Sequence, residues 1–146
     1  MKVEPARRLD EQDHRSLALW AANCAEHVLP HFEGDYPEDD RPRKAIEAGR
    51  AWARGEIRCG KARAAAVAAH AAARAADEGA ARAAARAAGH AAATAHMAGH
   101  ARHAAAYAVK ATTASAAGTA AATERDWQCR RLPQHLRPAA SPVRGK

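Results

Sequence analysis

Alanine fills most of the positions between residues 61 and 123, and bulky apolar side chains are rare there. A buried alanine methyl contributes only about 0.8 kcal/mol, so this stretch cannot be stabilised by a core of large side chains. Alanine has the highest helix propensity of all residues. Small side chains also let helices approach to the short end of the usual spacing of about 8–10 Å. The stretch therefore predicts helices that pack closely through alanine faces.

The hydrophobic spacing and the stop signals predict an all-α protein, a compact bundle of four to five helices with alanine-rich close packing. Buried positions of the first helix are expected at Leu17, Trp20, Cys24 and Val28, and a polar loop is expected at 31–39. The expected helices run from the Asp10 cap to Pro30, from Asp40 to Gly55, and over residues 61–77, 80–110 and 124–132.

The length of 146 residues suits one domain. We expect a single helical domain at residues 1–137 and a disordered basic tail at 138–146. The helices at 61–77 and 80–110 are expected to form an antiparallel hairpin with facing alanine surfaces.

The charge is unevenly distributed along the chain. Residues 1–60 contain ten Lys/Arg and twelve Asp/Glu, whereas residues 61–146 contain thirteen and four. A basic half suggests an acidic partner or nucleic acid, but the Arg bias of a GC-rich genome is the favoured explanation. The arginines are dispersed along helices and few aromatic residues accompany them, so the sequence does not favour nucleic acid.

The compartment is inferred from three features. The three cysteines are odd in number, the start Met1–Asp10 is charged, and no apolar run is long enough for a membrane span. We therefore expect a cytoplasmic protein with no membrane partner. The alanine faces favour association into a homodimer, because association buries more surface.

An acidic cluster stands out between the first two helices, and it is the expected partner-binding surface: Glu33, Asp35, Glu38, Asp39 and Asp40. The segment Asp39–Arg43 that follows supports two interpretations. Its carboxylates cap a helix, or Arg41 and Arg43 clamp a carboxylate or phosphate of a ligand.

Histidines supply the other candidate chemistry. His96, His100 and His103 are spaced i, i+4 and i+7 within one expected helix, so they are metal-ligand candidates for zinc or a similar ion. The spacing lacks the glutamate of HExxH, so a solvated helix face or a polar groove between helices are the alternatives. No cofactor is otherwise indicated. The pocket candidates are Asp40, Arg41, Arg43, His70, His90, His96 and His100.

Catalytic motifs are absent from the sequence. There is no phosphate-binding glycine loop and no nucleophile elbow, and Cys24 lies among apolar helical neighbours typical of a core residue. The sequence favours a binding protein over an enzyme and names no reaction.

Four stretches of the chain resemble a known family of proteins. They are SLALWAANCAEHVLPHFE at 16–33, DDRPRKAIEAGRAWARGEI at 39–57, AAHAAARAA at 68–76 with AARAAGHAAATAHMAGHA at 84–101, and ERDWQCRRLPQHLR at 124–137. The family is the fifth immunity-protein family of bacterial polymorphic toxin systems, including its five-like branch. The Asp-Arg-Pro-Arg helix start and Trp52 are the most distinctive parts.

The resemblance implies an all-helical antidote that binds a protein toxin domain and neutralises it without catalysis. The positions that match the family pattern are Trp20, Cys24, Asp40, Arg41, Arg43, Trp52, His70, His90, His96 and His100. The alternative is a helical protein or enzyme that binds a small molecule or a metal in a His/Arg/Asp pocket.

Overall fold

The computed structural model describes residues 9–115 and 120–140, and these residues form helices without any strand. The all-α prediction is confirmed. The described elements are α1 (Glu11–Val28), α2 (Pro30–Glu33), α3 (Arg41–Ala53), α4 (Cys59–Ala75), α5 (Ala80–Ala93), α6 (His100–Ser115), α7 (Ala120–Arg130), the 3-10 turn η1 (Gln134–Leu136) and α8 (Arg137–Ala140).

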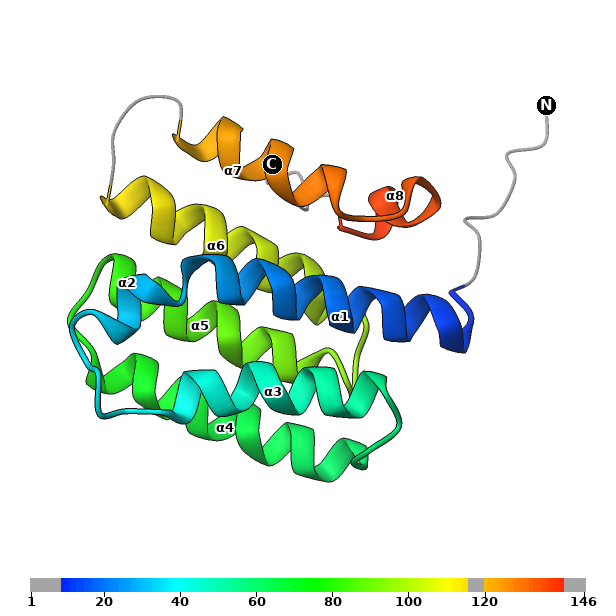
Figure 1. Cartoon of the computed structure of the whole chain (residues 1–146), viewed down its shortest axis with the longest axis horizontal. Coiled ribbons are helices and arrows are strands. Elements are labelled where there is room, and N and C mark those ends of the chain that lie inside the picture. Colours follow the sequence, from blue (N-terminus) through cyan, green and yellow to red (C-terminus); the bar gives the residue numbers. More distant parts are fainter. Residues whose placement is uncertain (1–8, 116–119, 141–146) are drawn as a thin grey trace.

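Helix α5 lies in the middle of the bundle and contacts α1, α2, α3, α4 and α6 (Figure 1). Ten of its 14 residues are buried, and all ten are alanine or glycine. At its contact with α3, a Cβ added to Gly49 would lie 3.1 Å from the carbonyl oxygen of Ala91. Backbone contact therefore sets the spacing between these two helices, because neither side chain is large enough to hold them apart.

The bulky core residues flank this alanine centre. They come from α1 and its continuation, from α3 and from the C-terminal segment, and the largest fully buried ones are Phe32, Leu17, Leu29, Ile46 and Leu136. Trp20 and Cys24 are also buried, as the hydrophobic spacing predicts. The two ends of the chain thus supply the large apolar side chains that α4, α5 and α6 lack.

Several helix ends coincide with the predicted stop signals. Helix α1 ends just before Pro30, and α3 begins after Asp40 with Pro42 in its first turn. Gly55 and Gly79 adopt positive φ angles of 77° and 115° after α3 and before α5. Glycine is favoured at such angles because a Cβ would clash with the backbone. The predicted hairpin of α4 and α5 is also present, with buried alanines on both helices.

The predicted helix at 80–110 is wrong, because the chain reverses direction between α5 and α6. Helix α5 ends at Ala93, and α6 begins only at His100. The hydroxyl of buried Thr94 donates to the carbonyl oxygen of His90 at 2.9 Å. A ring nitrogen of His14 in α1 lies 2.5 Å from the carbonyl oxygen of Thr94. The carbonyl oxygen of Thr94, which has no acceptor role within α5, thus gains a partner. The reversal also lets α6 bury its alanines against α5.

The number of helices also exceeds the predicted four to five. The reversal makes two helices out of one, and α2 occupies part of the segment expected as a loop. Helix α8 takes in residues 138–140, which the sequence assigns to the tail, and Ala139 and Ala140 pack against the core. The rest of the predicted tail, residues 141–146, lies outside the described residues.

Helix α7 is held to the bundle by buried polar contacts. The indole N–H of Trp20 donates to the carbonyl oxygen of Gln128 at 2.8 Å, and the Gln128 amide donates to that of Ala105 at 2.9 Å. Glu124 is buried and lies 2.9 Å from the ring of His27. These contacts join α7 to α1 and α6, so the C-terminal segment completes the fold. Within the described ranges, no helix has the length and apolar character needed to cross a membrane.

Enlarging an alanine at the centre of α5 is expected to destabilise the protein. Ala88 is fully buried, so Ala88→Leu should lower the free energy of unfolding by about 2 kcal/mol, because the added atoms force the helices apart. The matched control is Ala64→Leu at an exposed position of α4, where no such strain arises. Urea unfolding followed by circular dichroism measures both variants. An equal effect of the two substitutions would contradict the backbone-limited packing of α5.

Candidate functional site

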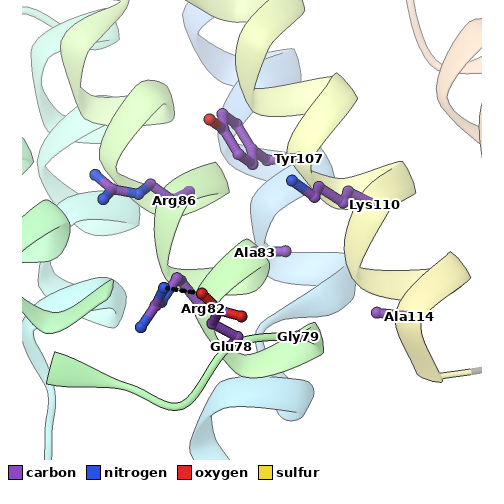
Figure 2. Close-up of a pocket in the computed structure, with 8 residues that line it drawn as sticks. All are labelled: Glu78, Gly79, Arg82, Ala83, Arg86, Tyr107, Lys110 and Ala114. Carbon is purple, nitrogen blue, oxygen red and sulfur yellow. Dashed lines mark hydrogen bonds and ion pairs between the residues drawn. The ribbon is translucent and has the colours of Figure 1, made fainter. Parts of the chain in front are cut away.

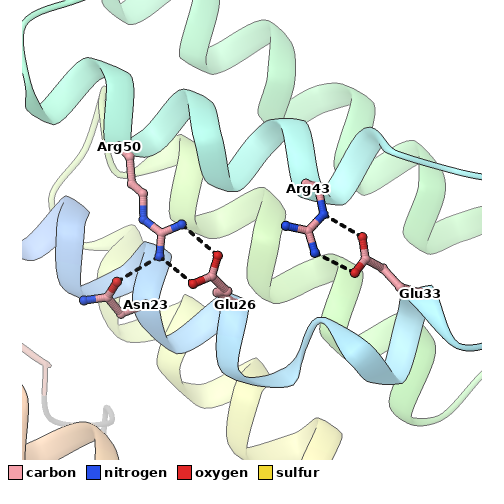
Figure 3. Close-up of polar contacts among 5 residues, drawn as sticks. All are labelled: Asn23, Glu26, Glu33, Arg43 and Arg50. Carbon is pink, nitrogen blue, oxygen red and sulfur yellow. Dashed lines mark hydrogen bonds and ion pairs between the residues drawn. The ribbon is translucent and has the colours of Figure 1, made fainter. Parts of the chain in front are cut away.

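Two arginines of α3 bind carboxylates of α1 and α2 (Figure 3). Arg43 donates two hydrogen bonds to the carboxylate of Glu33, at 2.8 and 2.7 Å. Two turns further along α3, Arg50 donates to both oxygens of Glu26 at 2.9 and 3.0 Å, and also to Asn23. Bidentate pairs of this kind fix geometry as well as charge. They connect α3 to α1 and α2.

The start of α3 carries two further pairs. Arg41 donates its Nε and Nη2 hydrogens to the carboxylate of Asp39, at 2.9 and 2.7 Å, and its backbone N–H donates to the same group at 3.1 Å. Asp40 lies 3.2 Å from Lys44 one turn later. The hydrogen bonds from Arg41 and Arg43 lower the pKa values of Asp39 and Glu33. Arg41 and Arg43 thus bind carboxylates of this chain.

The loop between α2 and α3 is fixed at its middle. The hydroxyl of Tyr36 accepts a hydrogen bond of 2.9 Å from the backbone N–H of Asp77, and the Tyr36 ring stacks on Phe32 with centroids 5.1 Å apart. Asp35 and Glu38 are exposed on this loop. Of the five carboxylates of the expected acidic surface, Asp35, Glu38 and Asp40 are exposed, and Asp40 also pairs with Lys44, while Glu33 and Asp39 pair with Arg43 and Arg41.

Histidines from α4, α5 and α6 meet on another part of the molecule. His90 is central, with ring centroids 4.9 Å from His70, 5.1 Å from His100 and 5.3 Å from both His103 and Tyr107. The Nδ1 atoms of His90 and His100 are 2.9 Å apart, so one donates a hydrogen to the other. This contact needs at least one neutral ring, because two imidazolium ions have no acceptor nitrogen.

Burial keeps these rings neutral. Desolvation, with a smaller contribution from neighbouring positive charges, lowers the pKa of His70 to about 4 and that of His90 to about 3. The pKa of His100 is lowered for the same main reason. The neutral His70 ring faces Arg86, whose guanidinium lies 3.0 Å from its Nδ1 atom. Gly89 makes room for this ring, because a Cβ there would lie 2.6 Å from it.

The pocket candidates fall into two groups. His70, His90 and His100 are brought together, whereas the side-chain contacts of Asp40, Arg41 and Arg43 are with Lys44, Asp39 and Glu33. His96 lies in the turn between α5 and α6, is exposed, and touches only the edge of the group, through His100 at 5.1 Å. The residues that share a face are thus drawn from three helices, and the spacing within one helix does not identify them.

The metal candidates were derived from one continuous helix, which the structure divides. His96 precedes α6, while His100 and His103 lie in its first turn with centroids 6.1 Å apart. Across residues 9–115 and 120–140, no three His, Cys, Asp or Glu side chains are arranged to hold a metal ion. Zinc binding by His96, His100 and His103 stays a prediction for elemental analysis of the purified protein.

A pocket that the sequence does not indicate lies between α5 and α6 (Figure 2). Its volume is about 390 Å³, and Arg82, Arg86, Tyr107 and Lys110 are among its lining residues. In a continuous helix Lys110 would lie about 36 Å from Arg86. The chain reversal brings the two residues to the same pocket, so only the i, i+4 pair of Arg82 and Arg86 was visible in the sequence.

Together, these observations define an all-helical, alanine-packed domain with a braced acidic loop. The chain belongs to the family described as Imm-5 like putative immunity protein, whose family model matches residues 7–135. This match confirms the resemblance drawn from the sequence. No curated protein and no solved structure matches the chain.

The histidine group predicts a loss of stability in mild acid. An unfolded histidine takes up its proton near pH 6.5, whereas folded His70 and His90 do so only near 4 and 3. The unfolded state therefore binds more protons in this window, and stability falls as the pH decreases from about 6.5 toward 3. For half-buried rings the loss is on the order of 3 kcal/mol.

Urea unfolding at several pH values measures this dependence. His90→Gln should flatten it, because the most strongly depressed pKa is removed. His31→Gln is the control, since His31 lies outside the group. If His90→Gln retains the slope of the parent protein, the neutral histidine group is not its source.

Proposed function

We propose that this protein is an immunity protein that binds a toxin domain in a stoichiometric complex and blocks it without catalysis of its own. Membership of the immunity-protein family supports the general role. The observation that carries the proposal is the acidic loop between α2 and α3. Its exposed carboxylates are held in place by the Arg43–Glu33 pair and by the hydrogen bond from Asp77 to Tyr36. A fixed, charged loop at the surface is suited to binding a protein partner.

The internal ion pairs of the loop determine which carboxylates we assign to the partner. Glu33, Asp39 and Asp40 are engaged with Arg43, Arg41 and Lys44. Asp35, Glu38 and Asp40 are exposed, and within the described residues only Asp40 of these three has an ion pair, so Asp35 and Glu38 are the contacts we propose. Their charge fits a basic patch on the toxin domain, and Glu33, Asp39 and Asp40 add to the negative potential around them.

Rigidity of the loop contributes to affinity. The Tyr36 hydroxyl ties the loop to the end of α4, and the Arg43–Glu33 pair ties its start to α3. A loop that is already ordered loses less conformational entropy when it binds. The internal bonds of Glu33 and Asp39 thus support binding indirectly, by holding the loop in place.

Charge reversal at the two outward carboxylates tests this assignment. The double variant Asp35→Lys/Glu38→Lys should bind the toxin domain that the parent protein neutralises at least about tenfold more weakly, mainly through slower association. Surface plasmon resonance measures the rates, and survival of cells that express the toxin measures protection. The control is Glu56→Lys/Asp126→Lys, which makes the same charge change at exposed positions away from the loop.

The two measurements separate the role from the contact. Protection by the parent protein with unchanged affinity of the loop variant would reject the loop as the contact and keep the immunity role. Absence of both complex and protection with the parent protein would reject the immunity role itself.

A binding protein for a small molecule or metal, or an enzyme, is the second candidate function. The half-buried group of His70, His90 and His100 favours it, because perturbed pKa values cluster at functional sites. Stoichiometric zinc, nickel or iron in the tag-free protein would support this alternative.

We also propose a cytoplasmic location. Cys24, Cys59 and Cys129 are all free thiols, as is usual in a reducing compartment. The predicted homodimer is examined by sedimentation equilibrium of the purified chain.

A further inference from the structure

The pocket between α5 and α6 has the size and charge of a small-molecule site. Its volume of about 390 Å³ lies in the range of ligand pockets. Arg82 and Arg86 line it from α5, and Tyr107 and Lys110 line it from α6 (Figure 2). Its single carboxylate, Glu78, is exposed and lies 3.4 Å from Arg82. Three cations against one carboxylate leave the pocket with an excess of positive charge.

Two cations of this pocket differ in their partners from four arginines in the first half of the chain. Arg15, Arg41, Arg43 and Arg50 each bind a carboxylate within 3 Å. In contrast, among the described residues no ion pair is found for Arg86 or Lys110. Arg86 contacts a neutral histidine, and Lys110 lies 5.8 Å from the centre of the Tyr107 ring. Within the described part of the chain, neither positive charge is therefore paired with a carboxylate at ion-pair distance.

Neutral acceptors also hold the two arginines of this pocket in place. Arg82 donates to the carbonyl oxygens of Ala73 and Ala76 at the end of α4, at 3.1 and 2.8 Å. Arg86 is held against His70, whose position depends on the space above Gly89. Arg82 and Arg86 are one helical turn apart, and like charges at this spacing repel each other. A bound anion would relieve this repulsion.

We infer that this pocket binds a small molecule that carries a phosphate or pyrophosphate group, with Arg86 and Lys110 as its principal charge partners. Phosphate suits the donors present, because guanidinium groups bind its oxygens in a bidentate manner and an ammonium adds a point charge. Tyr107 supplies a hydroxyl donor, and Ala83 and Ala114 supply apolar wall for the rest of the molecule.

A neighbouring pocket is the reason for which we propose a ligand with more than one phosphoryl group. Arg86 also lines a second pocket of about 400 Å³, together with Arg74, His70, His90 and Val67. Arg86 thus stands between two cationic pockets. A ligand with two phosphoryl groups offers anionic oxygens to both of the pockets that Arg86 lines. The site uses none of the loop carboxylates, so it is independent of the proposed toxin contact.

Isothermal titration of the full chain with pyrophosphate, phosphate and citrate tests the inference at physiological ionic strength. One saturable site is expected, with pyrophosphate bound more tightly than phosphate and citrate most weakly. Arg86→Gln and Lys110→Gln should each weaken pyrophosphate binding about tenfold. Arg54→Gln and Lys61→Gln are the controls, since they remove the same charges at exposed positions outside the pocket and should leave the affinity unchanged.

Three results would overturn the inference. One is absence of saturable binding by pyrophosphate, and another is citrate binding as tight as that of pyrophosphate. The third is equal weakening by the pocket variants and the controls, which would indicate attraction by net charge alone. Amide chemical shifts of the folded protein decide the location, with changes expected at residues 79–86 and 107–114. Since Lys110 is exposed, Lys110→Gln should fold normally and keeps the test valid if Arg86→Gln does not.

Discussion

The close approach of α5 to its neighbours is the constraint on which the rest of the structure depends. Five helices contact α5, and its buried positions carry only methyl groups or hydrogens. At Gly49 the backbones are so close that no Cβ fits without movement of α3 or α5. Alanine cores gain little free energy per residue, so the bundle depends on helix propensity and on the bulky residues contributed by α1, α2 and the C-terminal segment.

Helices that pack through alanine and glycine also bring the polar side chains on α4, α5 and α6 close to one another. His70, His90 and His100 meet across three helices, and the space above Gly89 admits the His70 ring. Burial lowers the pKa of His70 to about 4, so the ring that faces Arg86 carries no charge at neutral pH. Close helix packing thus places the positive charge of Arg86 beside a neutral ring.

The charged groups of the two halves are used differently. In the first half, arginines of α3 pair with carboxylates and brace the acidic loop. In the second half, Arg86 and Lys110 line a pocket without such partners in the described part of the chain. The two regions adjoin at the turn before α5, where Tyr36 of the loop accepts from Asp77 and Glu78 begins the pocket. The chain belongs to a family of putative immunity proteins, and the proposed partner contact and the proposed phosphate pocket lie in adjoining regions of the fold.

The sequence by itself determined the helical class, the family, the buried face of α1, and the ends at Pro30, Gly55 and Gly79. These features depend on local geometry, because proline and glycine act within one turn of the chain. Only the tertiary structure decided that the helix expected at 80–110 reverses after Ala93. The segment 94–99 holds no proline, and the reversal is stabilised by His14 from α1 and by burial of α6 against α5. That reversal places Lys110 near Arg86, and long-range packing also directs Arg43 to Glu33, so the site follows from contacts that no local pattern encodes.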